Sequence, residues 1–187
     1  PPGRPSGRAA VLVKVIADDG TVGWGQSVPV PKWSYETLET ANSTIRRYWT
    51  PALIGLDPFD TEAVEAAMNR GIAPSFSTGQ PLARAGIDLA LFDLTGRLLG
   101  RTAAQRWQRS GHDRLTLSWT LNPRTLEETE LLVEQGWSRG YRHFNVKVAP
   151  DPKFDLALCR LVKQLLPSGF LWADANGGYD EATALAV

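Results

Sequence analysis

The hydrophobic positions along the first 110 residues follow the pattern of a strand hairpin and then of helices. Residues 9–17 are rich in valine and isoleucine and end at Asp18-Asp19-Gly20, a signal for a tight turn. Residues 21–26 are therefore expected to return as a second strand. Helices are predicted over residues 34–48 and 60–71, in a long stretch from Pro81, and in a short stretch from Thr102 to Gly111. This part of the chain is predicted to be an α+β unit.

The long helix from Pro81 carries apolar residues at a helical spacing. The positions i, i+3, i+7 and i+10 are occupied by Leu82, Ala85, Leu89 and Phe92. This spacing places the four side chains on one side of a helix, so they are predicted to form its buried face.

After Leu115 the pattern changes to strands that alternate with amphipathic helices. The strands are predicted over residues 115–122, 143–148 and 170–175. Thr125 and Glu128 have the spacing of a capping box at the start of the first of these helices, and a further helix is predicted after Tyr179. Strand, helix and strand in turn indicate parallel strands that are joined by right-handed crossovers.

We predict two domains, an α+β domain at residues 1–112 and the first part of a β/α barrel at residues 113–187. Three parallel strands cannot close an eight-stranded barrel, because closure requires the complete ring of strands. The chain is therefore expected to be incomplete.

Composition narrows the classes of function. Hydrophobic residues make up 43% of the 187 residues and charged residues 21%, which fits a folded domain and argues against disorder. Lys plus Arg and Asp plus Glu number 20 each, so no net charge attracts nucleic acid or an anionic membrane. Cys159 is the single cysteine, which fits a reducing, cytoplasmic compartment. No apolar stretch approaches the roughly 20 residues that cross a bilayer.

Two short polar clusters fall at the ends of the second and third predicted strands. Asn145 and Lys147 are two residues apart, so their side chains point to the same face of a strand. Asp174 and Asn176 repeat this spacing. Lys147 and Asp174 are 27 residues apart, close to the roughly 30 residues of a strand–helix–strand unit. An amine and a carboxylate are therefore expected to meet near one end of neighbouring parallel strands, where barrel enzymes carry their catalytic residues.

Structural interpretations compete with a role in chemistry for each of these residues. Lys147 by itself is typical of a solvated lysine at a strand end, and Asn176 fits a turn as well as a substrate contact. Asp174 lies too early to cap the following helix, because Gly177 and Gly178 intervene. A helix-capping role is therefore not expected for Asp174.

Three segments together resemble the enolase superfamily, specifically its mandelate racemase and muconate-lactonizing group. They are ARAGIDLALFDLTGRLLG (83–100), NVKV (145–148) and WADAN (172–176). The resemblance extends from the hairpin to the end of the chain. It implies an α+β capping domain followed by the first part of a modified (β/α)₈ barrel.

The resemblance also implies a chemistry. Lys147 matches the second lysine of the family's Lys-x-Lys motif, a general base that faces the substrate α-carbon. Asn145 stands at the first position, so chemistry that needs two lysines is not expected. Its amide is expected to donate a hydrogen bond to the substrate or to orient Lys147. Asp174 matches the first of three carboxylates that bind Mg²⁺, and Asn176 matches a position beside the substrate or a metal-bound water. A divalent cation held by oxygen ligands stabilises the negative charge that forms when the α-proton leaves.

Loops of the capping domain in this family contact the distal end of the substrate. The candidates here are the loop around Trp24 to Trp33 and the loop around Phe76. Trp24, Trp33 and Phe76 are expected to form a compact apolar lid, with Lys32 or Ser77 as its polar contact. Such a lid favours a small or cyclic substrate over a long polyhydroxylated sugar acid.

The resulting prediction is a Mg²⁺-dependent dehydratase that acts, as a homo-oligomer, on a small carboxylate substrate. APSFSTGQ (73–80) and NVKVAPDPKFD (145–155) resemble family members that dehydrate cis-3-hydroxy-L-proline. A racemase or epimerase of an amino-acid or hydroxy-acid derivative is the alternative. A third interpretation is a fragment with an incomplete metal site, and the 187 residues by themselves are expected to be inactive.

Overall fold

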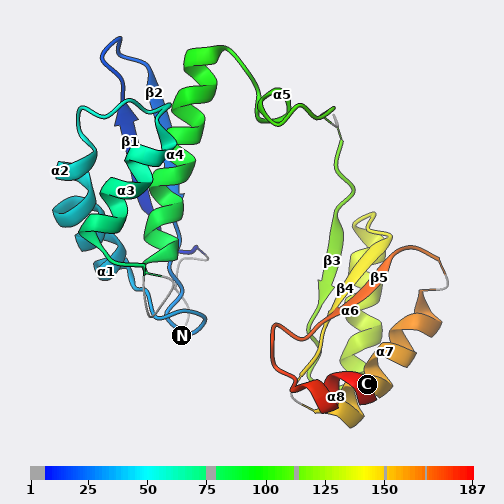
Figure 1. The fold of residues 1–187 in the computed structure, drawn as a ribbon. Coiled ribbons are helices and arrows are strands. Elements are labelled where there is room, and N and C mark those ends of the chain that lie inside the picture. The colour runs from blue at the N-terminus through cyan, green and yellow to red at the C-terminus, as the bar shows by residue number, and fades with distance from the viewer. Residues whose placement is uncertain (1–6, 75–78, 112–113, 150, 167) are drawn as a thin grey trace. The chain divides into compact units, whose positions relative to one another are not determined.

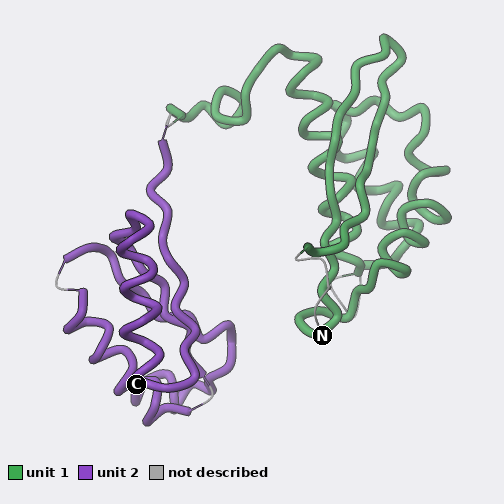
Figure 2. The backbone as a smooth tube through the Cα atoms, turned by 180° about the vertical axis from the view of Figure 1, so that it is seen from behind, with its two compact units in different colours: residues 1–111 green, residues 112–187 purple. Residues whose placement is uncertain are grey.

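The structure is a computed structural model that describes residues 7–74, 79–111, 114–149, 151–166 and 168–187. The chain divides into two compact units, residues 1–111 and residues 112–187 (Figure 1) (Figure 2). Each unit has a hydrophobic core of its own. Across the described ranges, none of the helices combines the length and the apolar character that a membrane span needs.

The first unit begins with the predicted hairpin. β1 (Val11–Ile16) pairs antiparallel with β2 (Val22–Ser27). In the turn, Asp19 accepts the N–H of Thr21 at 2.8 Å, and Gly20 has a φ of +86°, a conformation that glycine adopts without strain. The hairpin prediction is confirmed, with strand ends that shift by one or two residues.

The helical segment after the hairpin differs from its predicted range, 34–48. It consists of α1 (Leu38–Ser43), the π-helix η1 (Thr44–Trp49) and α2 (Thr50–Leu53). The start moves to Leu38 because Thr37 and Thr40 form a capping box, in which each side chain accepts the backbone N–H of the other residue. The segment continues past Tyr48 and buries Trp49 completely.

The helices α3 (Thr61–Gly71) and α5 (Ala103–Arg106) are each capped by the residue that directly precedes them. Asp60 accepts the N–H of Ala63 at 2.9 Å, which confirms the predicted start of α3. Thr102 and Gln105 form a second capping box, which confirms the start of α5. α5 nevertheless ends at Arg106, short of its predicted end.

The long helix α4 (Pro81–Leu99) is capped by a residue far away in the sequence. Pro81 stands in its first turn, as predicted. Glu36 is fully buried, and its two carboxylate oxygens accept the N–H of Leu82 at 2.6 Å and that of Ala83 at 2.8 Å. A carboxylate is favourable there because the first N–H groups of a helix lack partners within the helix. Glu36 thereby fixes the end of the β2–α1 loop to the start of α4.

The buried face of α4 differs from the predicted one. Leu89, which belongs to the predicted stripe, is 50% exposed. The buried stripe includes Ala83, Gly86, Ile87, Ala90 and Leu94. The reason is the close approach of β2: a Cβ on Gly25 would stand 2.1 Å from the carbonyl oxygen of Gly86. Small residues make this contact, whereas the prediction relied on the positions of large apolar ones.

The second unit is a parallel sheet with helical crossovers. Its strands lie in the order β3 (Ser118–Leu121), β4 (His143–Lys147) and β5 (Leu171–Asp174). Its helices are α6 (Leu126–Ser138), α7 (Pro152–Leu165) and α8 (Glu181–Ala186). The predicted parallel pairing is confirmed for both strand pairs. The strands are shorter than predicted, and the first begins at Ser118 rather than at residue 115.

Two helix starts in this unit refine the predictions. Thr125 accepts the N–H of Glu128 at 3.3 Å, but the Glu128 carboxylate accepts the N–H of Arg124 at 2.7 Å, so the reciprocal half of the predicted capping box is not formed. Asp180 caps α8. Asp174 is therefore not a helix cap, as the two glycines after Asn176 indicated.

The two faces of the parallel sheet differ in polarity. Phe144 and Val146 point to the helices and are buried in the core with Leu121, Leu158 and Val162. Alternate residues of a strand point to opposite faces. By the pairing register, the other face is shared by Ser118, Thr120, His143, Asn145, Lys147, Trp172 and Asp174. The candidate site residues of the second unit thus lie on the face opposite its hydrophobic core.

We expect Gly25→Ala to lower the free energy of unfolding by about 1–3 kcal/mol or more, because the added Cβ would meet backbone atoms of α4 that cannot rotate away. Urea denaturation measures the change. Gly7→Ala is the control, since a Cβ there meets no atom within 4 Å. Equal stability of the two variants would show that β2 and α4 are packed less closely than described.

Candidate active site

The register of β4 against β5 places the amine of Lys147 beside the carboxylate of Asp174. The two residues are partners in the parallel ladder. Lys147 Nζ lies 2.5 Å from Asp174 Oδ2, and the two side chains are 28% and 31% exposed. The amine and the carboxylate therefore meet at the ends of neighbouring strands, as their spacing in the sequence indicated.

Asn176 is drawn into the same cluster by a tight turn. Its N–H donates to Asp174 Oδ1 at 2.9 Å, and its φ of +47° is a left-handed conformation that asparagine tolerates. The turn carries its side chain to Lys147, whose Nζ donates to Asn176 Oδ1 at 2.8 Å. Asn176 is thus both a turn residue and a partner of the lysine.

Asn145 shares the polar face but takes no part in these contacts. In the ladder it stands between Thr120 of β3 and Trp172 of β5. Its Oδ1 is buried and has no hydrogen-bond partner among the residues that the structure describes. Within the same residues, Asn176 rather than Asn145 orients the amine of Lys147. A buried acceptor without a donor can take a hydrogen bond from a bound molecule.

The charge state and the donor atoms of Asp174 fit part of a Mg²⁺ site. The hydrogen bond from Lys147 lowers the pKa of Asp174, and the N–H of Asn176 lowers it further, so the carboxylate is ionised at neutral pH. Mg²⁺ prefers oxygen ligands and commonly takes one or two protein carboxylates together with water and substrate. Asp174 and the amide oxygen of Asn176 supply such donors. Over the described ranges, no cluster of three or more His, Cys, Asp or Glu side chains completes the set.

A polar pair behind the strand ends, of which the carboxylate is buried, escaped the sequence prediction. Asp155, in the first turn of α7, is 3% exposed. Its Oδ2 accepts the N–H of Ala149 at 2.8 Å and the hydroxyl of Tyr179. Burial, and then the Asp155 carboxylate, raise the pKa of Tyr179 to about 12. The helical spacing could have revealed the burial of Asp155, because this residue occupies the same apolar stripe of α7 as Leu158 and Val162.

Cys159 lies one turn after Asp155 on α7 and packs against the core of the second unit. Burial raises the pKa of its thiol, and the neighbouring Asp155 carboxylate raises it further. A protonated thiol is a poor nucleophile. The cysteine is therefore better explained as a core residue than as a reactive one.

The residues expected to form a lid belong to the first unit. Lys32 and Trp33 are exposed in the loop between β2 and α1. Phe76 and Ser77 lie outside the described residues. The placement of Trp24 in the lid loop is wrong, because this residue lies within β2 and pairs with Lys14 of β1. The glycines on either side of Trp24 face α4, and the alternation of the strand turns its indole outward.

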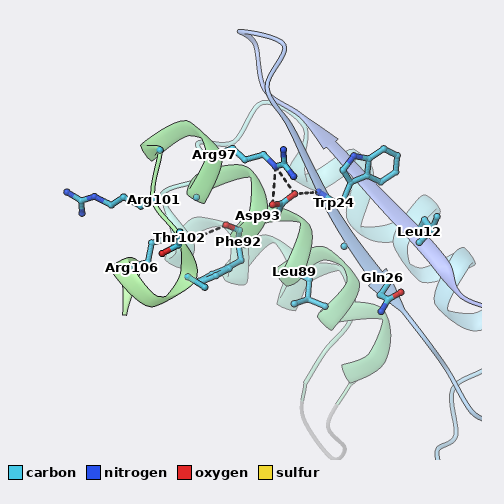
Figure 3. Close-up of a pocket in the computed structure, with 14 residues that line it drawn as sticks. Leu12, Trp24, Gln26, Leu89, Phe92, Asp93, Arg97, Arg101, Thr102 and Arg106 are labelled. Atoms are coloured by element: carbon cyan, nitrogen blue, oxygen red, sulfur yellow. Dashed lines mark hydrogen bonds and ion pairs between the residues drawn. The ribbon is translucent and has the colours of Figure 1, made fainter. Parts of the chain in front are cut away.

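Trp24 lines a cavity of about 820 Å³ on the first unit instead (Figure 3). The lining includes the apolar residues Leu12, Leu89 and Phe92 and the basic residues Arg97, Arg101 and Arg106. Asp93 accepts the N–H of Trp24 at 2.9 Å and Arg97 Nε at 3.0 Å, and Arg106 donates to the carbonyl of Phe92 at 2.6 Å. The bond to Asp93 holds the backbone of Trp24 through a contact within the unit itself.

Comparison with known proteins reveals one consistent likeness. Residues 5–105 match the family model of the N-terminal domain of mandelate racemase and muconate lactonizing enzyme. A chloromuconate cycloisomerase of Cupriavidus necator is 34% identical over 179 residues, which cover 93% of this chain and 47% of that protein. An N-succinyl-L-Arg/Lys racemase of Bacillus cereus is 28% identical over 174 residues, which cover 91% of this chain and 45% of that protein.

Solved structures show the same fold. The crystal structure of the N-succinyl Arg/Lys racemase from Bacillus cereus superposes with a TM-score of 0.82 at 27% identity and covers 96% of this chain and 48% of that one. The crystal structure of the muconate cycloisomerase from Pseudomonas fluorescens superposes with a TM-score of 0.79 at 27% identity and covers 96% of this chain and 50% of that one. The chain spans about half the length of the relatives that it matches. The likeness confirms the predicted fold class, in which an α+β capping domain precedes a β/α domain.

We expect the hydroxyl of Tyr179 to titrate at about pH 12 and the variant Asp155→Asn to lower that pKa, because the variant removes the charged acceptor and leaves the burial. A raised pKa means that the folded chain keeps a proton which the unfolded chain loses near pH 10. This contribution to stability is therefore complete below pH 10 and is lost as the pH rises through about 12. Tyrosine ring signals in NMR measure the titration, and an unchanged Tyr179 curve in the variant would contradict the contact.

Proposed function

This chain belongs to the mandelate racemase and muconate lactonizing enzyme family of the enolase superfamily, and on that basis we propose that the protein removes the proton alpha to the carboxylate of a small-molecule substrate. The observation that carries the proposal is the contact of the Lys147 amine with Asp174 and Asn176 on the polar face of the sheet. The relatives named above are cycloisomerases and a racemase, so membership of the family leaves the product of the reaction open.

Lys147 is proposed as the general base. A base must be positioned within hydrogen-bond reach of the proton that it takes. Two oxygen atoms, from Asp174 and Asn176, already fix the position of Nζ, so little freedom is lost when a substrate binds. The amine accepts the α-proton, and the negative charge passes to the substrate carboxylate. Asn145, with its unpartnered buried Oδ1 in the described structure, is proposed to accept a hydrogen bond from the substrate.

Asp174 is proposed as a ligand of Mg²⁺, with the amide oxygen of Asn176 close by. Mg²⁺ bound there would supply positive charge that stabilises the negative charge developing on the substrate carboxylate. The lowered pKa of Asp174 supports this role, because the carboxylate is ready to bind a cation over the whole neutral range. Asn176 adds an oxygen donor without a second negative charge, and its turn keeps Asp174 Oδ1 oriented.

For the complete reaction we propose the dehydration of a small hydroxy acid such as cis-3-hydroxy-L-proline. When Lys147 takes the α-proton, the remaining electron pair forms a carbon–carbon double bond as the β-hydroxyl departs. The hydroxyl takes up one proton from the solvent and leaves as water, and the protonated Lys147 returns one proton to the solvent, so atoms and charge balance. The aromatic residues Trp33 and Phe76, with Lys32 or Ser77 as a polar contact, support a small or cyclic substrate. Trp24 is no longer included in this set.

Racemisation or epimerisation of an amino-acid derivative is the second candidate. The similarity to the N-succinyl-L-Arg/Lys racemase of Bacillus cereus favours it. So does the similarity to an L-Ala-D/L-Glu epimerase of Clostridium acetobutylicum, which is 27% identical over 94% of this chain. In this reaction the α-proton returns to the opposite face of the same carbon, so Lys147 serves as one of two bases.

We further propose that the protein acts in the cytoplasm, as a homo-oligomer, on a free small molecule. The equal numbers of basic and acidic residues and the lone, unpaired cysteine support this setting. The proposal of a homo-oligomer is supported by membership of the family alone.

We expect Lys147→Ala, in the native protein, to slow the exchange of the substrate α-proton with deuterated water by about 10²–10⁴-fold, the usual contribution of a general base. NMR of the substrate measures the exchange, and both enantiomers are followed because a base on the opposite face can exchange one of them. Lys163→Ala, which removes an exposed lysine of α7, is the control and should exchange normally. Undiminished exchange of both enantiomers by Lys147→Ala would remove this residue from the base role.

A substrate panel of hydroxyprolines, proline betaines and aldonic acids, incubated with Mg²⁺, separates the two candidate reactions. A dehydratase is expected to release water from cis-3-hydroxy-L-proline. A racemase is expected to invert the α-carbon and incorporate deuterium without losing water. A chelator should stop either reaction, and renewed Mg²⁺ should restore it. Turnover that survives complete removal of the metal would refute the Mg²⁺ proposal.

A further inference from the structure

The candidate site is carried by two turns, and one buried carboxylate joins them. One turn follows β4, directly after Lys147, and the other follows β5, directly after Asp174. Asp155 belongs to neither turn, since it lies in α7. Its Oδ2 nevertheless accepts the N–H of Ala149 from the first turn, at 2.8 Å, and the hydroxyl of Tyr179 from the second.

The backbones of the two turns also lie against each other. A Cβ on Gly178 would stand 2.8 Å from the Cβ of Ala149, so only glycine fits at this position without a shift. The N–H of Val148 continues the strand ladder by donating to the carbonyl of Asp174 at 3.1 Å. The two turns are therefore joined by close packing and by a backbone hydrogen bond.

Ala149 requires an external contact to keep its conformation. Its φ of +85° is one that residues other than glycine seldom adopt. A strained residue of this kind persists only where surrounding contacts hold it. The hydrogen bond from its N–H to Asp155 is such a contact, and it fixes the chain two residues after Lys147.

The burial of Asp155 also calls for a reason beyond packing. A leucine at this position would continue the apolar stripe of α7, whereas a carboxylate that is 3% exposed is costly unless hydrogen bonds satisfy it. The two donors that satisfy it come from the two turns and not from the core. The carboxylate is thus placed to select one arrangement of the turns over others.

We propose that Asp155 and Tyr179 are positioning residues for the candidate active site. Their contact holds the turn after β4 against the turn after β5, and the meeting of Lys147 with Asp174 and Asn176 depends on it. Neither residue touches the reacting atoms. The catalytic consequence rests on the proposed function, whereas the structural consequence stands without it.

The kinetic test compares Tyr179→Phe, Asp155→Asn and the double variant in the native protein. Tyr179→Phe removes one hydroxyl and keeps the ring, so it provides a folded variant even where Asp155→Asn does not. We expect each single change to lower kcat for α-proton exchange by about 10- to 100-fold with KM little altered, because misplacement by about 1 Å costs about 100-fold. The double variant should be no slower than the slower single variant, since Tyr179→Phe removes a contact that Asp155→Asn already weakens.

The control is Thr125→Ala, which weakens α6 of the same unit without touching either turn contact. Thr125 caps α6 by accepting the N–H of Glu128. Its loss should lower the melting temperature and leave kcat unchanged. If Tyr179→Phe behaves like this control, with a lower melting temperature and an unchanged kcat, the positioning role is overturned.

A second measurement is independent of catalysis. Amide hydrogen exchange at Ala149 and Gly178 should become faster in Tyr179→Phe, while exchange at Val146 in the middle of β4 should not change. Unchanged protection of the amides of Ala149 and Gly178 from hydrogen exchange would contradict the proposal. A wild-type protein that exchanges the α-proton of no substrate would instead overturn the proposed function, and the amide exchange alone would then decide whether the two turns are joined in this way.

Discussion

The register of β4 against β5 is the constraint on which the candidate site depends. Lys147 and Asp174 meet because they are paired in a parallel ladder. A slip of one residue in either strand would turn one of the two side chains to the apolar face. Phe144 and Val146, packed against the helices, hold β4 in register. The free energy that positions the polar groups therefore comes from apolar burial on the other side of the same strands.

The features that the sequence could predict are local or periodic. The alternation of polar and apolar residues indicated which side chains of β4 share a face, and the interval from Lys147 to Asp174 indicated a single strand–helix–strand unit. Asp60 and Thr102 were recognisable as helix starts because an N-cap acts on residues two or three positions away. These signals are complete within a short window of sequence, so the fold class and the meeting of amine and carboxylate followed from them.

The features that escaped prediction are contacts between distant segments. Glu36 caps a distant helix by accepting the N–H of Leu82, 46 residues later, and no local pattern marks it as that partner. The buried face of α4 was assigned to its larger apolar residues, although the closeness of Gly25 selects the small ones. Trp24 was assigned to the lid together with the loop that ends at Trp33, but the glycines on either side of it mark the contact of β2 with α4. Asp155 stood out only as a polar residue in an apolar stripe, and its partners lie in two separate turns.

The position of Cys159 has a practical consequence for studying this molecule. It is the sole thiol of the chain, and it lies on the helix that carries Asp155. Because burial raises the pKa of this thiol, an alkylating reagent reacts with it slowly while α7 is docked. Undocking of the helix increases both solvent access and thiolate formation. An alkylation rate that rises in a variant thus indicates that the support behind Lys147 and Asp174 opens more often, without an engineered label.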